Sequence, residues 1–327
     1  MQKVLLTGAA GYIGSVATAL LLNNGFKVVA LDNLMYGGES LLSYWHNPMF
    51  KFIKLDITDI KSIREFLKKN NFDAIIHLAA IVGDPACAKN KDLAYKVNME
   101  GSLNLIEAAI KNGVKRFIFA STCSNYGKMS PDEHFVDENS PLAPVSLYAE
   151  LKVKVENIIL NEIEKNDTFC PTCLRFATVY GLSPRMRFDL TVNEFTKELA
   201  LGRELQVFGE QFWRPYCHVY DIANAIKIVL TAEETKVAYN VFNVGEDEEN
   251  YQKKMIIGEI IKFIPNAMVK YIFKAEDPRD YRVSFKKIKD ILNFKITKKV
   301  PDGIYEILTA LNAGLFNNPD FGGFYNA

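Results

Sequence analysis

Short apolar runs alternate with longer stretches of helical periodicity through the first half of the chain, and this alternation limits the possible folds more than any other feature. Buried strands are expected over residues 4–7, 27–31, 50–55, 74–78, 116–120 and 168–176. Helices are expected over residues 13–23, 60–69, 92–112 and 147–165. Strands that alternate with helices form βαβ units, in which helices cover both faces of a parallel sheet. The sequence therefore predicts an α/β fold with a doubly wound parallel sheet of the Rossmann type.

The pattern changes after residue 181. Further helices are expected near 189–201, 221–231, 251–263, 284–292 and 301–313, and short strands over 204–208, 239–244 and 268–273. Asp221 is a suitable N-cap for the helix that it precedes. We expect a nucleotide-binding domain over 1–180 with return segments near 215–245, and a smaller portion over 181–327 that mainly binds substrate.

The charge balance excludes some classes of partner. The 327 residues include 39 Lys+Arg and 39 Asp+Glu, so no net charge attracts nucleic acid or an anionic membrane. No stretch reaches the roughly 20 apolar residues of a membrane span. The apolar run at residues 4–6 is too short for a secretory signal. We therefore expect a cytoplasmic protein.

The five cysteines do not indicate a disulfide framework, because their number is odd and their spacing is scattered. Cys170 and Cys173 form a single CxxC pair within an apolar run. A structural zinc site usually needs four ligands, and no second pair accompanies this one. The pair is expected to lie in a buried strand, and no metal site is predicted.

A glycine-rich turn, GAAGYIG at 8–14, directly follows the first predicted strand and opens the first predicted helix. Gly8, Gly11 and Gly14 suit a tight turn, close approach of a pyrophosphate, and close packing of helix and strand. The helix N-terminus offers free N–H groups to phosphate. Asp32 follows the second strand, where a carboxylate binds ribose hydroxyls and repels a 2′-phosphate. The pattern predicts NAD rather than NADP.

A tyrosine and a lysine, Tyr148 and Lys152, lie four residues apart at the start of a predicted helix and therefore share one face. A nearby ammonium favours the phenolate, which is able to accept a proton from a substrate hydroxyl. Upstream, the Ser/Thr-rich segment at 120–127 ends the fifth strand, where loops line the ligand crevice of a parallel sheet. Each of these features alone also fits ordinary packing or a polar turn, and their positions together favour a catalytic site.

Together these motifs resemble the extended short-chain dehydrogenase/reductase family, and specifically its nucleotide-sugar epimerases, dehydratases and decarboxylases. The resemblance runs over almost the whole chain. It is carried by GAAGYIG at 8–14, Asp32-Asn33, Asp56-Ile57, HLAA at 77–80, Asn98, STCSNYG at 121–127, YAELK at 148–152, LRFATVYG at 174–181 and RPYCHVYD at 214–221.

The resemblance implies a role for each matching position. Tyr148 would be the general base, Lys152 its partner and Thr122 the catalytic hydroxyl. The implied cofactor-binding residues are Gly8, Gly11, Tyr12, Ile13, Gly14, Asp32, Asn33, Asp56, Ile57, Leu78, Ala79, Ala80, Tyr148 and Lys152. The implied substrate-binding residues are Ser121, Ser124, Thr178, Arg187, Arg214, Arg279 and Arg282, with Arg214 on the diphosphate. His77 and His218 are expected to be structural.

Two departures from the family pattern bear on the reaction. Cys123 and Ser124 stand where the 4,6-dehydratases carry an Asp-Glu pair, so the acid and base for loss of water are missing. The related decarboxylases also keep a Glu there. Epimerases that only oxidise and re-reduce C4 need no such carboxylate. Thr178 stands where many relatives have Asn, which changes the expected contacts to the substrate.

The resemblance implies oxidation of the C4 hydroxyl of a nucleotide-activated sugar, GDP- or UDP-linked, by bound NAD. Segments 33–50 and 175–190 resemble bacterial enzymes of capsule and lipopolysaccharide sugars, which favours a C4 dehydrogenase acting on GDP-heptose. The alternatives are a 4-epimerase, a non-catalytic NAD-binding regulator, and an NADP-dependent reductase, against which Asp32 argues. The helices at 92–112 and 146–165 carry wide apolar faces, and the family implies that they form a homodimer or a dimer of dimers.

Overall fold

The structure is a computed structural model that describes residues 2–129, 134–165, 167–274, 277 and 279–326. Its centre is a seven-stranded sheet in the order β10-β6-β5-β4-β1-β2-β3, with every neighbouring pair parallel. The strands are β1 (Lys3–Thr7), β2 (Lys27–Asp32), β3 (Phe50–Lys54), β4 (Ala74–His77), β5 (Arg116–Thr122), β6 (Cys170–Phe176) and β10 (Asn240–Val244). The predicted α/β fold with a doubly wound parallel sheet is confirmed.

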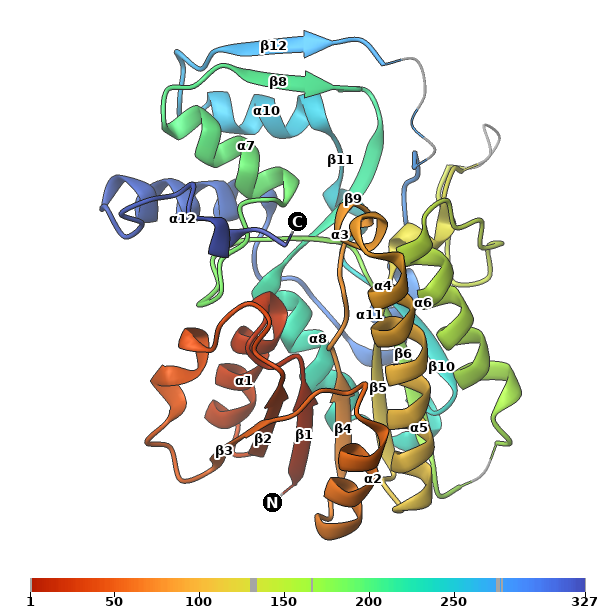
Figure 1. The fold of residues 1–327 in the computed structure, drawn as a ribbon. Helices are drawn as coiled ribbons and strands as arrows, with labels where there is room; N and C mark the ends of the chain where they lie inside the picture. The colour runs from red at the N-terminus through yellow and green to blue at the C-terminus, as the bar shows by residue number, and fades with distance from the viewer. Residues whose placement is uncertain (1, 130–133, 166, 275–276, 278, 327) are drawn as a thin grey trace.

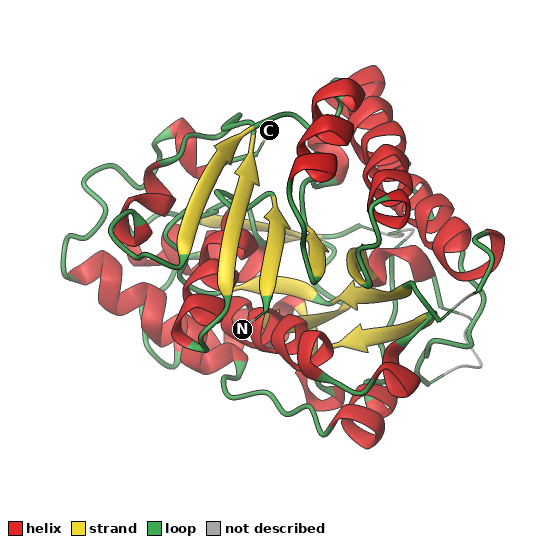
Figure 2. Cartoon of the chain, turned by 90° about the horizontal axis from the view of Figure 1, so that it is seen from below, coloured by secondary structure: helices red, strands yellow, loops and turns green. Residues whose placement is uncertain are grey.

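Helices cover both faces of this sheet (Figures 1 and 2). One face packs against α1 (Tyr12–Asn23), α8 (Val219–Thr231) and α11 (Lys286–Leu292). The other packs against α2 (Ile60–Lys69), α5 (Ser102–Lys111) and α6 (Leu147–Asn157). Because successive side chains of a strand point to opposite faces, β1 contributes Val4 and Leu6 to one core and Leu5 to the other. The continuous apolar runs of the sequence follow from this two-sided burial.

The helix expected over 92–112 is divided into three consecutive segments. They are α4 (Lys91–Tyr95), the π-helical η2 (Lys96–Gly101) and α5, and a short helix that the sequence did not indicate, α3 (Asp84–Lys89), precedes them. The Asn98 side chain bonds both backbone groups of Ile81, at 2.8 and 2.9 Å. The helix expected over 147–165 is also divided. Its first part, α6, ends at Asn157, and the chain continues as the π-helical η4 (Ile158–Glu162).

A smaller group of elements lies above the carboxyl ends of the strands in Figure 1 and is called the cap below. It contains α7 (Thr191–Ala200), β8 (Leu205–Phe208), α10 (Lys253–Ile261), β12 (Val269–Ile272) and α12 (Val300–Asn312), around a separate apolar core. A three-stranded sheet that the sequence did not predict, β7 (Thr178–Tyr180), β9 (Trp213–His218) and β11 (Asn250–Gln252), leads from the main sheet to the cap. The remaining short elements are η1 (Glu39–Tyr44), η3 (Cys123–Tyr126), α9 (Glu234–Val237), η5 (Asp247–Glu249) and η6 (Gly322–Phe324).

The predicted N-cap of α8 is wrong. The helix begins at Val219, and its N-cap is His218, whose ring accepts a hydrogen bond from the Tyr220 N–H at 3.2 Å. Asp221 lies fully buried in the first turn instead. Its carboxylate accepts from the Thr297 N–H and hydroxyl, at 3.0 and 2.8 Å, and thereby fixes the segment that enters α12.

The two cysteines of the CxxC pair lie in β6, as predicted, and both are buried. Three residues apart in a strand, they point to opposite faces of the sheet, so that Cys170 joins one core and Cys173 the other. They are therefore unable to share a metal ion or form a disulfide with each other. Among the described helices, none combines the length and the apolar character needed to cross a membrane.

Candidate active site

A pocket of about 540 Å³ lies at the carboxyl ends of the central strands, between the sheet and the cap. The strand order reverses at β1, between β4 and β2, and such switch points are where open α/β sheets bind ligands. Every residue predicted for the site except Arg282 borders this one pocket. Residues from 8 to 326 meet here, so the fold gathers positions that are far apart in the sequence.

The glycine-rich turn forms the floor of the pocket. Gly8 has φ +70°, and a Cβ atom there would lie 2.7 Å from the Ala79 nitrogen, so both the conformation and the space require glycine. Gly11 is the N-cap of α1 and provides no side-chain cap. The N–H groups of the first turn of α1 are therefore free to bind an anion, which suits a pyrophosphate.

Two carboxylates stand beside this turn. Asp32 accepts hydrogen bonds from the Ala10 N–H at 3.0 Å and the Leu34 N–H at 2.8 Å, and burial nevertheless raises its pKa. Asp56 accepts from the Asn33 side chain at 2.9 Å. Burial opposes ionisation of Asp56, but the bonds from Asn33 and Thr58 outweigh it and lower the pKa of this carboxyl. The paired acceptors suit the hydroxyls of a ribose rather than a phosphate.

Tyr148 and Lys152 share one face of α6 and border the pocket. The Lys152 ammonium is 3% exposed, donates to the Ala120 carbonyl at 2.7 Å, and lies 5.9 Å from the centre of the Tyr148 ring. Burial lowers the pKa of Lys152 to about 8. Burial also raises the pKa of Tyr148, and the charge of Arg187 opposes that rise. The phenol is therefore neutral at rest and needs additional positive charge to ionise.

The end of β5 and the segment after it border the same pocket as Tyr148. Thr122 and Ser124 border the pocket, and the Thr122 hydroxyl accepts from the Ser124 N–H at 3.1 Å. The Cys123 thiol turns into the core, where it contacts the Arg175 carbonyl at 3.2 Å. Neither position 123 nor position 124, both of which the structure describes, therefore presents a carboxylate to the pocket.

Ser121 differs from its predicted role. It is 3% exposed, and its hydroxyl donates to the buried Glu156 carboxylate at 2.7 Å, so this hydroxyl has no hydrogen left to donate to a substrate. Glu156 on α6 forms a buried ion pair with Arg175 on β6. Arg175 also donates to the Tyr126 hydroxyl at 2.9 Å. This network, which the sequence analysis missed, ties α6 to β6 and to the segment after β5.

The arginines of the cap side are held by carboxylates. Arg214 on β9 pairs with Asp277 at 3.2 Å, and Arg279 pairs with Asp84 at 2.5 Å. Arg187 forms a two-pronged contact with Asp189, at 3.0 and 2.7 Å. Thr178, at the start of β7, borders the pocket beside them.

The prediction for Arg282 is wrong, since this residue does not border the pocket. Its guanidinium stacks on the rings of Phe135 and Trp213, 5.1 and 5.2 Å from their centres. The sequence signal for this position was only its proximity to Arg279. Conversely, the sequence analysis missed several polar residues that do line the pocket, namely Tyr36, Asp84, Arg185, Asp189, Lys253, Asp277 and Asn326.

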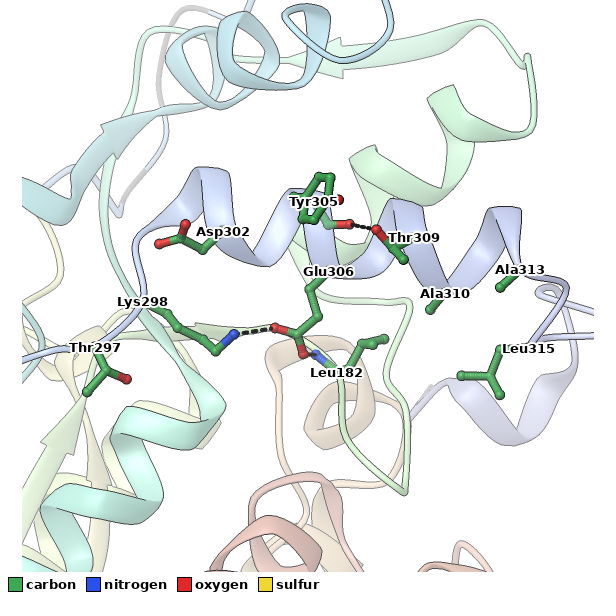
Figure 3. Close-up of a pocket in the computed structure, with 10 residues that line it drawn as sticks. All are labelled: Leu182, Thr297, Lys298, Asp302, Tyr305, Glu306, Thr309, Ala310, Ala313 and Leu315. Atoms are coloured by element: carbon green, nitrogen blue, oxygen red, sulfur yellow. Dashed lines mark hydrogen bonds and ion pairs between the residues drawn. The ribbon is translucent and has the colours of Figure 1, made fainter.

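A second hollow lies along α12 and contains none of the predicted site residues (Figure 3). Its centre is Glu306, which accepts from Lys298 at 3.2 Å and lies 3.1 Å from the His218 ring. His77 is fully buried and bonds Thr7 and Ser102, at 2.8 and 3.0 Å, and burial lowers its pKa to about 3. Both histidines thus hold the structure together, as expected from their places at strand ends.

Comparisons with known proteins agree with this geometry. A family model described as the NAD dependent epimerase/dehydratase family matches residues 4–245. The UDP-glucuronate 4-epimerase of Thermodesulfobacterium geofontis is 28% identical over 316 residues, which span 93% of this chain and 94% of that protein. The crystal structure of the Thermotoga maritima UDP-glucose 4-epimerase with UDP-glucose is 26% identical, with a TM-score of 0.84 over 96% of this chain and 100% of that one.

A third relative was solved with both ligands bound. The Bacillus cereus UDP-glucuronic acid 4-epimerase, in complex with UDP-glucuronic acid and NAD, is 26% identical, with a TM-score of 0.83 over 96% of this chain and 100% of that one. These three relatives are 4-epimerases of UDP-linked sugars.

Proposed function

The chain belongs to the NAD dependent epimerase/dehydratase family, and from this we propose that it is a 4-epimerase of a UDP-linked sugar. It is an NAD-dependent enzyme of the extended short-chain dehydrogenase/reductase type. One observation carries the proposal: Tyr148, Lys152 and Thr122 border the same pocket as the glycine-rich turn and Asp32. In the proposed enzyme, a proton acceptor and a dinucleotide-binding turn would therefore share one cavity.

The residues of the pocket fit NAD. The uncapped N-terminus of α1 offers N–H groups to the pyrophosphate, and the turn at Gly8 has no room for a side chain. Asp32 and Asn33 would hold the adenosine ribose, and Asp56 and Ile57 the adenine. Leu78, Ala79 and Ala80, next to the glycine-rich turn, would also line the cofactor-binding part of the pocket. When bound, NAD would supply the hydride acceptor for oxidation of the sugar carbon and the hydride donor for its re-reduction.

Tyr148 would remove the proton from the C4 hydroxyl of the sugar. The phenol is poised for this by Lys152, whose ammonium stabilises the phenolate electrostatically, and by the positive charge of the oxidised cofactor. The Thr122 hydroxyl, which borders the same pocket, would donate a hydrogen bond to the same oxygen. After re-reduction, Tyr148 returns the proton.

The diphosphate of the substrate would bind Arg214 and Arg279. Both guanidiniums border the pocket, and at present Asp277 and Asp84 neutralise them. A diphosphate would compete with these carboxylates for the same donors. Thr178, Ser124 and Arg187 would contact the sugar or its linkage from the same side.

A C4 dehydrogenase releases the 4-keto sugar, whereas a 4-epimerase reduces it again. The sequence resemblance favours a dehydrogenase of GDP-heptose, whereas the activities of the relatives support the alternative, an epimerase of UDP-sugars. In the described part of the chain, no carboxylate at position 123 or 124 supports elimination of water. Re-reduction from the opposite face of the sugar requires no further acid or base.

We also propose that the enzyme is a homodimer. The helices α4, η2 and α5 follow one another along the chain and lie beside α6 on one flank of the sheet (Figure 1). Tyr95 and Ile110 on this flank remain 46% and 38% exposed in the single chain. A second copy would cover these apolar side chains.

The proposed function is tested by incubating the purified enzyme with UDP-, GDP-, dTDP- and CDP-linked sugars, heptoses included, and recording product masses and NMR spectra. An epimerase gives a C4 isomer of unchanged mass from a UDP-sugar. Loss of two hydrogens from a GDP-heptose would instead identify a dehydrogenase. Loss of water or carbon dioxide would contradict the assignment of Cys123 and Ser124.

A further inference from the structure

Arg185 is a buried cation that the proposed chemistry does not use. It is 7% exposed, borders the pocket, and its Nε atom has no hydrogen-bond partner. In the described part of the chain it forms no ion pair, since the nearby Asp189 is engaged with Arg187. A buried guanidinium N–H without a partner is costly, which indicates that a ligand satisfies it.

The position of Arg185 is fixed by the first turn of α1. Two residues earlier, the Ser183 hydroxyl donates to the Tyr12 carbonyl at 2.7 Å and lies 3.0 Å from the Ser15 hydroxyl. The Tyr12 hydroxyl donates to the Gly181 carbonyl at 2.6 Å. The segment 181–185 is therefore fastened to the helix end that offers its N–H groups to a phosphate.

Contacts with two further segments also orient the Arg185 guanidinium. Its guanidinium stacks 4.6 Å above the ring of Tyr36, which follows Asp32 in the loop after β2. Its Nη2 atom donates to the Tyr325 carbonyl at 3.1 Å. Tyr325 in turn accepts a hydrogen bond from Lys197 at 2.7 Å through its hydroxyl. The guanidinium is thus held rigidly between the loop after β2 and the segment 320–326.

We propose that Arg185 binds the pyrophosphate of NAD from the cap side, opposite the N-terminus of α1. Tyr36, on which Arg185 stacks, and Tyr12, to which the segment 181–185 is bonded, belong to the cofactor-binding half of the pocket, whereas Arg214 and Arg279 pair with Asp277. A guanidinium suits a pyrophosphate because its donors form two parallel bonds to phosphate oxygens. The bound cofactor would then be held between the sheet and the cap.

The test compares Arg185→Leu with the wild type by calorimetry on NAD-free protein, using NAD, ADP-ribose and UDP as separate probes. We expect NAD and ADP-ribose to bind about tenfold to a hundredfold more weakly to the variant, the effect of losing a charge-assisted hydrogen bond. UDP affinity should stay within about twofold. Arg185→Lys should recover part of the lost affinity, because lysine keeps the positive charge but lacks the paired N–H donors of the guanidinium.

The matched control is Arg64→Leu, which removes the same charge from an exposed position on α2, outside the pocket. It should bind all three probes as the wild type does. Circular dichroism and the unfolding temperature verify that each variant is folded, and Arg185→Gln replaces the leucine variant if that one does not fold.

The three probes distinguish binding of Arg185 to the pyrophosphate of NAD from binding to the diphosphate of the substrate. Weaker UDP binding with unchanged NAD binding would assign Arg185 to the substrate and overturn the proposal. Unchanged binding of NAD and ADP-ribose would overturn it as well, as would an equal loss for all three probes. None of these measurements requires turnover, so the result is independent of whether the enzyme proves to be an epimerase.

Discussion

The environments of two side chains, Tyr148 and Lys152, decide whether the pocket is able to move a proton. Tyr148 borders the cavity and its pKa is raised by burial, so it is protonated in the free protein. Lys152 is deeper, 3% exposed, and its charge lies beneath the ring of Tyr148. In the proposed mechanism, the tyrosine therefore depends on the lysine and on the oxidised cofactor for its reactivity.

Replacing Tyr148 with phenylalanine removes the proton acceptor and leaves the ring in place. We expect the turnover number to fall about 10²- to 10⁴-fold, the usual contribution of general acid–base catalysis. NAD content per chain should remain as in the wild type, because the glycine-rich turn is unchanged. Retention of full activity in Tyr148→Phe would remove this residue from the mechanism.

Lys152 makes the stability of the NAD-free protein depend on pH in a defined direction. Burial lowers its pKa from 10.5 to about 8 in the folded protein. Between these pH values the unfolded chain binds a proton that the folded chain lacks, so this group makes the free energy of unfolding rise with pH. Urea unfolding of wild type and Lys152→Met should show their difference growing in favour of the wild type by up to about 3 kcal/mol from pH 8 to pH 10.5. If the free energies of unfolding of the wild type and Lys152→Met changed in parallel with pH, the lowered pKa of Lys152 would be ruled out.

At the scale of elements, the buried Glu156–Arg175 pair joins α6, which carries Tyr148, to β6 beside the Thr122 segment. Removing one partner leaves an uncompensated buried charge, so Arg175→Met should lower the free energy of unfolding by about 3–5 kcal/mol. The double variant Glu156→Leu/Arg175→Met should be more stable than this single variant. Equal losses in the two variants would show that the network does not depend on charge pairing.

The elements with strong periodicity could be predicted from the sequence, and the short ones could not. The strands β1, β2, β4 and β5 are nearly continuous apolar runs because both faces of the sheet are covered, which gives a clear signal. The strands β7, β9 and β11 contain three to six residues and owe their pairing to contacts between distant segments, for which no local pattern exists. The sequence also did not indicate the π-helical turns at η2 and η4, because these turns leave the helical periodicity almost unchanged.

The same distinction holds for the candidate site. Residues in motifs, such as Gly8, Asp32 and Tyr148, were found because their spacing has a mechanism. Arg185 and Asp277 were missed, because a charged residue in an irregular segment resembles ordinary surface until the fold buries it. Arg282 shows the converse error, since its charge suggested a ligand and its actual contacts are two aromatic rings.

At the scale of the whole molecule, the flank formed by α4, η2, α5 and α6 is the expected dimer interface. Light scattering after size exclusion should give twice the 37.0 kDa mass of the chain, or a multiple of that dimer. Ile110→Lys, which places a charge on an apolar side chain of this flank, should shift the enzyme toward the monomer. A wild-type enzyme that stays monomeric at all concentrations would exclude this assembly.

The whole pocket, with the glycine-rich turn on one side and the arginines Arg185, Arg187, Arg214 and Arg279 in its lining, supports one central claim: a hydride leaves C4 of a UDP-sugar and returns to the same carbon. The most direct test uses the substrate that the sugar panel identifies, labelled with deuterium at C4, and follows the label by mass spectrometry and NMR. We predict that the C4 epimer retains the deuterium at C4 and that none appears in solvent or in released cofactor. Loss of the label to water, or its release on reduced cofactor with a keto sugar as product, would contradict the epimerase assignment.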